Sequence, residues 1–148
     1  MNTFVKSFQL FWGVVLFVFI FSNCSSSEEL TTLKGSKWKL EGIGDTNLDI
    51  ITELEPIDCK ECYTLIFDTE DDFSAHSSTN EMWGNYTANY KTLRIHITNF
   101  MGTKMGEIGD GALYYRFFNF IQSFSLQEDE LRLHNTNNDK YLLFKKQK

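Results

Sequence analysis

An alternating pattern in the middle of the chain places the strongest constraint on its fold. In residues 84–90, small or aromatic side chains take every second position, and Asn or Thr takes the positions between them. After a two-residue break the alternation resumes in residues 93–98, where Leu93, Ile95 and Ile97 share one face. A period of two is typical of a strand with one buried side. The two runs therefore predict an antiparallel hairpin with one apolar and one solvated face.

Further strands are predicted on both sides of this hairpin. In residues 36–43, Trp38 and Leu40 alternate with charged side chains, which predicts the first strand. Shorter runs predict strands at residues 63–67, 73–78, 124–126, 131–133 and 141–144. Residues 44–55 are polar with scattered Leu and Ile, so we expect a long loop that is closed by Pro56.

One helix is predicted in the second half of the chain. It follows the segment 102–111, in which four glycines permit a bent crossing. A phosphate-binding loop is excluded, because Thr103 precedes Lys104 instead of following a Gly-Lys pair. Asp110 can cap the helix. Apolar residues at spacings of three and four then define one face: Leu113, Tyr114, Phe117, Phe118 and Ile121.

These elements predict the fold class. We expect a mainly β domain with one helix, of the α+β class, built on an antiparallel sheet or partly open barrel of about seven or eight strands. The apolar face of the single helix should pack on the open face or end of the sheet. A ligand groove along that face is the alternative, because exposed aromatic residues of this size are normally functional.

The N-terminal residues have the pattern of an export signal. Lys6 is followed by residues 10–21, which carry no charge. A membrane-spanning helix needs about 20 apolar residues, so the shorter run predicts a secretory signal peptide of residues 1–23. The cysteine directly after it resembles a lipoprotein box, which implies that Cys24 is lipidated and begins the mature chain. Plain signal-peptide cleavage and a retained anchor are the alternatives.

Residues 24–34 predict a polar tether between Cys24 and the folded domain. Three serines and two glutamates in residues 25–29 resemble the surface-export signal of Bacteroidetes lipoproteins, and a plain flexible spacer is the alternative. We therefore expect a cell-envelope protein, anchored by lipid to the outer membrane and facing either the periplasm or the cell surface.

Charge restricts the possible partners. Without residues 1–23 the chain has 125 residues, a length that suits one domain. It keeps 13 basic and 20 acidic residues, a net charge of −7. This balance argues against nucleic acid or an anionic membrane face as a partner, so we expect membrane contact through the lipid on Cys24. Eight Phe, two Trp and six Tyr remain to build a core.

Cys59 and Cys62 form a Cys-x-x-Cys motif. A redox site needs the first thiol at a helix N-terminus, where its pKa falls, whereas this motif leads into the predicted strand 63–67. A zinc site needs four ligands, and only two thiols and three dispersed histidines are on offer. In an exported protein we expect a local disulfide. Metal binding and redox catalysis are the alternatives.

The acidic run 68–72 has oxygen ligands spaced as in a calcium site. It lacks the glycine and the final glutamate of a calcium loop, so we expect a charged turn between two strands. His76, His96 and His134 fall on outward strand positions and are expected to be surface residues. We expect no metal and no cofactor.

A family resemblance rests on the hairpin and its flanks. The residues that carry it are Gly35, Trp38, Leu40, Asn80, Gly84, Tyr86, Leu93, Thr103 and Met105. Their order resembles the META domain of bacterial META/HslJ-like lipoproteins over residues 35–145. That family commonly has a cysteine just before the Asn and another shortly after the Met, where this chain has Thr79 and Gly106. The resemblance implies a compact β domain, residues 35–148, on a cell envelope, and no particular chemistry.

The sequence favours a non-enzymatic binding or interaction module. It contains no Gly-x-Ser-x-Gly motif, and no nucleophile, base and orienting group occur at an interpretable spacing. A small envelope redox factor or hydrolase is the alternative. The partner could be another envelope protein, a glycan or an apolar ligand. We expect the contact region to include Trp83 and the loop 44–62, and a core position is the alternative for Trp83.

Overall fold

The structure, a computed structural model, describes residues 32–148. The predicted signal peptide, Cys24 and most of the predicted tether lie outside these residues. The described part contains one α-helix and nine strands: β1 (Lys37–Asp45), β2 (Ile50–Thr52), β3 (Thr64–Phe67), β4 (Asp72–His76), β5 (Glu81–Asn89), β6 (Arg94–Gly102), α1 (Gly111–Phe117), a 3₁₀ turn (Phe118–Phe120), β7 (Ile121–Gln127), β8 (Glu130–Asn135) and β9 (Lys140–Lys146).

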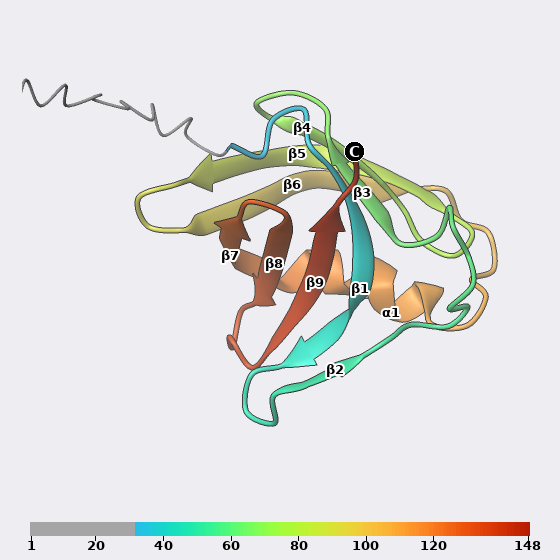
Figure 1. Cartoon of the computed structure of the whole chain (residues 1–148). Coiled ribbons are helices and arrows are strands. Elements are labelled where there is room, and N and C mark those ends of the chain that lie inside the picture. Colours follow the sequence, from blue (N-terminus) through green and yellow to red (C-terminus); the bar gives the residue numbers. More distant parts are fainter. Residues whose placement is uncertain (1–31) are drawn as a thin grey trace, which may run out of the picture.

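Eight of the strands form a closed antiparallel barrel (Figure 1). The strands follow the order β1-β3-β4-β5-β6-β7-β8-β9, and β9 pairs back onto β1 from Trp38–Lys146 to Asp45–Lys140. The predicted fold class, mainly β with one helix, is confirmed. The barrel is closed rather than partly open, because the first and last strands are paired along nearly their whole length.

The strand β2 is an addition to this barrel. The start of β1 pairs with β3 through Lys37–Ile66, whereas its end pairs on the same side with β2 through Ile43–Thr52. Residues 44–55 are therefore not only a long loop, as the sequence predicted. They contain the end of β1 and the short strand β2. The sequence did not predict β2, because these residues show no clear alternation.

The central hairpin has the predicted pairing. β5 and β6 are antiparallel, with Tyr86 opposite Ile97, and Tyr86 is buried. Leu93 was predicted to share the apolar face of Ile95, and this prediction was wrong. Leu93 is 45% exposed and has a φ of 54°, because it closes the turn that Asn89 begins by accepting two backbone N–H bonds.

The helix α1 lies in the connection between β6 and β7. These two strands share only the register pair Arg94–Ser123, and the chain between them returns through α1, which lies behind β8, β9 and β1 in the view of Figure 1. Phe118, directly after α1, stacks on Phe100 of β6 and Phe73 of β4, at centroid distances of 5.5 and 5.7 Å. Phe118 therefore joins the helix region to β4 and β6 inside the barrel.

The predicted helix was correct in place but too long. It ends at Phe117, Ile121 already belongs to β7, and Leu113 is 41% exposed rather than part of the packed face. Asp110 occupies the N-cap position but makes no side-chain cap bond. Its carboxylate instead accepts the backbone N–H of Glu55 at 2.9 Å.

Tyr114 is the central aromatic residue of the core. It is fully buried, and its ring contacts Tyr63, Phe118 and Phe144 edge to face. Its hydroxyl donates to the Thr64 carbonyl at 2.9 Å. Burial raises the pKa of Tyr114, so the hydroxyl stays protonated and the donor is permanent.

We predict that Tyr114→Phe destabilises the protein by about 1–3 kcal/mol, because the Thr64 carbonyl loses its side-chain donor inside the core. Urea unfolding measures the loss. The neighbouring Leu113→Ala should change the free energy of unfolding by only about 0.5 kcal/mol, because Leu113 is largely exposed. Equal effects of the two substitutions would contradict the assignment of Tyr114 to the centre of the core.

Candidate functional site

Asn80 is a buried polar residue between β4 and β5 that holds a distant loop. Its side-chain amide donates to the Met105 carbonyl at 2.9 Å, and its side-chain carbonyl accepts the Met105 N–H at 2.7 Å. The same oxygen accepts the Thr103 hydroxyl at 2.8 Å. Three of the residues that carry the family resemblance thus meet at one point.

Glu107 completes this arrangement, which we call the Asn80 clasp: Ser77, Ser78, Asn80, Thr103, Met105 and Glu107. The Glu107 carboxylate accepts the hydroxyls of Ser77 and Ser78 at 2.6 and 2.7 Å, and the Asn80 amide at 2.7 Å. Burial raises the pKa of Glu107, but these three donors outweigh it, so the pKa lies below its ordinary value. The sequence motifs had singled out neither Glu107 nor the two serines.

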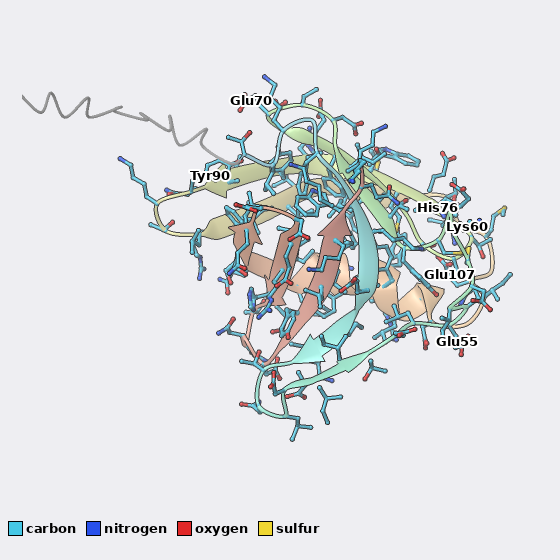
Figure 2. All side chains as sticks on the ribbon, viewed as in Figure 1. Glu55, Lys60, Glu70, His76, Tyr90 and Glu107 are labelled. Carbon is cyan, nitrogen blue, oxygen red and sulfur yellow. A yellow bond between two sulfur atoms is a disulfide. The ribbon has the colours of Figure 1, made fainter. Side chains whose placement is uncertain are left out.

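The Asn80 clasp is a fastening rather than a reactive centre. Its donors and acceptors bond to one another, and together they pin residues 103–107 to the turn between β4 and β5. Figure 2 shows Glu107 on the same side of the barrel as Glu55. The clasp therefore sets the path by which the chain enters α1.

A second link fastens the loop that follows β2. Asp110 accepts the Glu55 N–H and returns its own backbone N–H to the Glu55 carbonyl at 2.7 Å. The Tyr63 hydroxyl donates to the same carbonyl. Gly109, with a φ of 54°, lies so close that a Cβ there would be 2.2 Å from the Glu55 oxygen. The start of α1 is thus tied to the segment 53–55.

Of the other residues of the family resemblance, Gly35 and Leu93 are exposed, and the rest lie in the core: Trp38, Leu40, Gly84 and Tyr86. Trp38 is 1% exposed, and its ring N–H donates to the Ser36 hydroxyl at 2.6 Å. Tyr86 is buried and donates to the Thr69 carbonyl at 2.8 Å. At Gly84, a Cβ would press against the Phe73 ring at 2.9 Å. These residues lie on β1 and β5 and support the packing of the barrel.

Cys59 and Cys62 form a disulfide in the structure. Cys62 is buried, and Lys39 donates to the carbonyls of both cysteines. The next residue, Tyr63, has a φ of 55° and leads into β3, so the motif does not begin a helix that would lower a thiol pKa. The disulfide and Lys39 together hold the loop against β1.

The acidic run 68–72 forms the turn between β3 and β4. Its side chains bond to neighbours: Asp68 accepts the Ser74 hydroxyl at 2.8 Å, and Asp72 accepts the Asn85 amide at 2.6 Å. Within residues 32–148 no three His, Cys, Asp or Glu side chains are grouped so as to hold a metal ion.

Trp83 and the three histidines lie on different strands. Trp83 is 41% exposed on the outer face, opposite Ser74 and Met101. His96 is exposed, but His134 is not the simple surface residue that the sequence predicted. It packs against Tyr141 at a centroid distance of 5.3 Å, and burial, together with Arg132, lowers its pKa.

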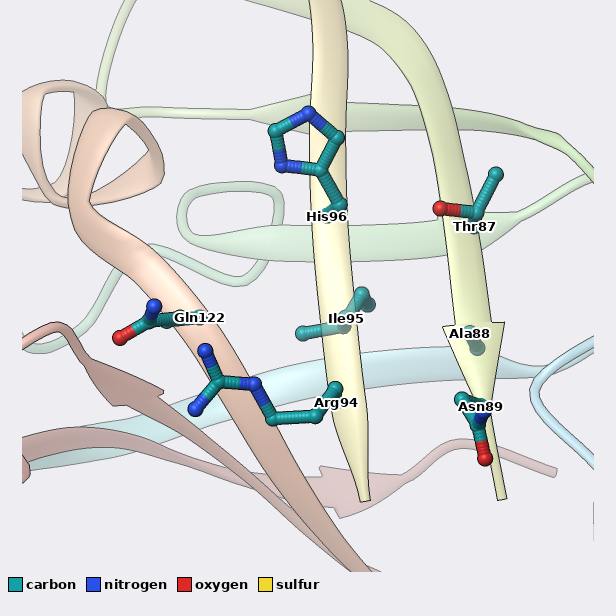
Figure 3. A pocket seen from close by; sticks show the side chains of 7 residues that line it. All are labelled: Thr87, Ala88, Asn89, Arg94, Ile95, His96 and Gln122. Carbon is teal, nitrogen blue, oxygen red and sulfur yellow. The ribbon is translucent and has the colours of Figure 1, made fainter. Parts of the chain in front are cut away.

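A shallow polar depression of about 270 Å³ lies on the outer face of the β5–β6 hairpin (Figure 3). Figure 3 shows Arg94 of β6 and Gln122 of β7 extending on neighbouring strands, with His96 further along β6. Its lining residues are Thr87, Ala88, Asn89, Arg94, Ile95, His96 and Gln122. The depression offers hydrogen-bonding groups next to a similar share of apolar surface.

A second and more apolar hollow, which we call the mouth cleft, lies at the end of the barrel between β2 and α1. Its volume is about 430 Å³, and its lining residues are Ile43, Gly44, Asp45, Leu48, Ile50, Thr52, Glu53, Leu54, Asp110, Leu113, Phe117 and Lys140. Leu54 and Phe117 are buried beneath it. Leu48, Ile50 and Leu113 form its rim and are 65%, 54% and 41% exposed.

Apolar rim residues of this size, next to buried apolar side chains, are typical of a binding surface. The predicted contact loop 44–62 supplies much of the rim, but Trp83 lies on a different surface. The sequence did not reveal that Leu113 lines the cleft, because the helical spacing placed this residue on the packed face. Its position next to Tyr114 and one turn after Asp110 gives no signal of exposure.

Comparison with known proteins identifies the family. The META domain model matches residues 31–148, so the chain belongs to the META domain family. This confirms the resemblance predicted from the sequence. A relative from Tannerella forsythia, described as "Putative lipoprotein", is 30% identical over 95% of this chain and 97% of its own length.

Two solved structures share the fold. A protein from Burkholderia xenovorans has a TM-score of 0.64 at 18% identity, covering 78% of this chain and 83% of its own. A DUF4847 family protein from Bacteroides vulgatus has a TM-score of 0.57 at 14% identity, covering 77% and 95%. In residues 32–148, no helix has the length and apolar character needed to cross a membrane.

We predict that Glu107→Ala destabilises the protein by about 1–3 kcal/mol at pH 7, because three buried or half-buried donors lose their acceptor. Since the folded pKa of Glu107 lies below 4.5, its contribution is complete above about pH 4.5 and is lost as the pH falls through the folded value. Urea unfolding at pH 7 and pH 3 measures both effects.

The control for this experiment is Glu128→Ala, an exposed carboxylate in the turn between β7 and β8. It should change the free energy of unfolding by no more than about 0.5 kcal/mol at either pH. A difference between Glu107→Ala and the unchanged protein that stays constant from pH 7 to pH 3 would contradict the role of the charged carboxylate.

Proposed function

We propose that this chain is a lipid-anchored protein of the cell envelope whose META domain is a non-enzymatic binding module. The observation that carries the proposal is the mouth cleft, an apolar hollow with three exposed apolar rim residues at one end of a filled barrel. The cleft is suited to an apolar group of a partner molecule.

The anchor is supported by the N-terminal sequence and by the relative. Residues 10–21 carry no charge and are followed closely by Cys24. The relative described as "Putative lipoprotein" aligns over 95% of the chain. Lipid on Cys24 would attach the domain to the outer membrane through residues 25–31.

The mouth cleft lies at the opposite end of β1 from the first described residues. The described chain begins next to the start of β1, and the cleft is lined by Ile43 and Asp45 at the end of β1. A strand of nine residues spans about 30 Å. In Figure 1 the described chain starts at the top of the barrel and β2 lies at the bottom. The cleft would therefore face away from the membrane.

The lining of the cleft supports binding rather than catalysis. It contains no Ser, Cys or His. Two of its carboxylates already accept backbone N–H bonds, since Asp45 accepts those of Asn47 and Leu48, and Asp110 accepts that of Glu55. These groups hold the walls of the cleft and do not form a nucleophile paired with a base.

We predict that Cys24→Ser abolishes lipidation and releases the protein from the outer-membrane fraction, because the thiol is the acceptor of the lipid. Incorporation of an alkyne-labelled fatty acid, followed by fractionation, measures both effects. The control Ser25→Ala should leave labelling and fractionation unchanged. Membrane retention of the Cys24→Ser protein at the normal level would overturn the anchor.

We predict that the mouth cleft takes up the neutral apolar dye Nile red. Leu113→Glu should weaken the dye's binding by about 5- to 30-fold, since it removes roughly 1–2 kcal/mol of apolar contact and adds a charge. Fluorescence titration of residues 25–148 carrying the substitution measures the change. The matched control is Leu93→Glu, an equally exposed leucine in the β5–β6 turn. Equal binding by both variants would overturn the cleft as the site.

A further inference from the structure

The strand β2 has an unpaired edge. It stands at the end of the strand order, whereas each strand of the barrel in the described chain has neighbours on both sides. All three of its residues, Ile50, Ile51 and Thr52, are exposed. Exposed edges are commonly protected by short strand length, charged side chains, Pro or a bulge; β2 is short and is flanked by Asp49 and Glu53, and residues 45–55 contain neither Lys nor Pro.

The segment around this edge combines acidic and apolar side chains. Residues 45–58 contain five carboxylates and no Lys or Arg: Asp45, Asp49, Glu53, Glu55 and Asp58. The same segment exposes four large apolar side chains: Leu48, Ile50, Ile51 and Ile57. The charge around the edge is therefore complementary to a basic partner with apolar side chains.

We propose that the free edge of β2 binds an extended, basic peptide segment of a partner protein, which adds to the sheet as a further strand. This rests on the proposed function of the mouth cleft and names its partner class. The main chain of the peptide bonds to β2, and its apolar side chains enter the cleft.

The register of β2 divides the side chains of such a peptide between two faces. Ile50 and Thr52 lie opposite Asp45 and Ile43 and line the mouth cleft. Ile51 is not among the lining residues, and successive side chains in a strand point to opposite faces. A peptide with alternating apolar and basic residues would therefore place one set in the cleft and the other on the outer face.

The acidic edge disfavours two other occupants. In a dimer formed by two β2 edges, the carboxylates of both copies would face each other, and like charges across an interface oppose association. An anionic lipid headgroup would meet the same repulsion. The only basic residue that lines the cleft is Lys140.

Gly42 allows the position of β2 to be tested without changing the peptide-binding residues. A Cβ at Gly42 would lie 2.5 Å from the Thr52 carbonyl oxygen and 2.8 Å from the Ile51 side chain. Gly42→Ala should therefore displace β2 from β1 and weaken peptide binding. Far-UV circular dichroism and urea unfolding should show that the barrel itself is retained.

The experiment uses the full mature chain in phosphatidylcholine nanodiscs, with empty nanodiscs as the reference. The probes are two fluorescent ten-residue peptides with blocked ends, one alternating Lys and Val and the other alternating Glu and Val. Fluorescence anisotropy should show binding of the Lys-Val peptide with a dissociation constant on the order of micromolar. The Glu-Val peptide should bind at least about tenfold more weakly than the Lys-Val peptide. Added salt should weaken the Lys-Val complex.

Charge reversal at the edge should reverse this preference. The double substitution Asp49→Lys with Glu53→Lys should weaken Lys-Val binding by about tenfold and strengthen Glu-Val binding. The matched control reverses two exposed carboxylates in the β7–β8 turn, Glu128→Lys with Asp129→Lys, and should leave both affinities unchanged.

Three results would overturn the proposal: equal binding of the two peptides, equal effects of the two double substitutions, or a β2-mediated dimer in place of peptide binding. Failure here is separate from failure of the proposed function. If Leu113→Glu still weakens Nile red binding while both peptides fail to bind, the mouth cleft stands and only the peptide partner is wrong.

Discussion

The pairing of β1 with three other strands is the constraint on which the rest of the structure depends. One edge of β1 pairs with β9, which closes the barrel. The other edge is shared, with β3 at the start of the strand and β2 at its end. A bulge between Leu40 and Gly42 bends the strand where the partners change, and the missing side chain at Gly42 lets β2 approach. Closure removes free edges from the eight-stranded barrel. The free edge of the sheet is therefore that of the added strand β2.

The filled interior explains why a binding surface lies at the mouth. An eight-stranded barrel is just wide enough for side chains to fill it, and here Trp38, Tyr86, Tyr114, Phe118 and Phe144 occupy it with at most 2% exposure. No room of ligand size is left among these rings. At the end of β1, however, β2 and α1 extend beyond the packed layer, so buried Leu54 and Phe117 continue directly into the exposed rim of Leu48 and Ile50.

The sequence predicted the elements whose pattern is local and strong. The alternation of residues 84–98 and the charged neighbours of Trp38 gave the strands, because one face of each is buried. The sequence could not predict β2, whose three exposed residues carry no alternation, nor the exposure of Leu113. Helical spacing describes one face of a helix but not which part of that face the barrel covers. Asp is a residue type that commonly caps helices, so the sequence predicted a cap at Asp110. Its carboxylate accepts the backbone N–H of Glu55 instead.

The fastenings around the mouth cleft determine what kind of partner it can hold. The Asn80 clasp fixes the chain leading into α1. The Glu55–Asp110 link and the Cys59–Cys62 disulfide fix the chain leaving β2. Both walls of the cleft are thus held in place before a partner binds, which lowers the entropic cost of binding. The tip between β1 and β2 is held as well, because the Thr46 N–H donates to the Asp139 carbonyl at 2.8 Å, so the cleft would meet its partner largely preformed.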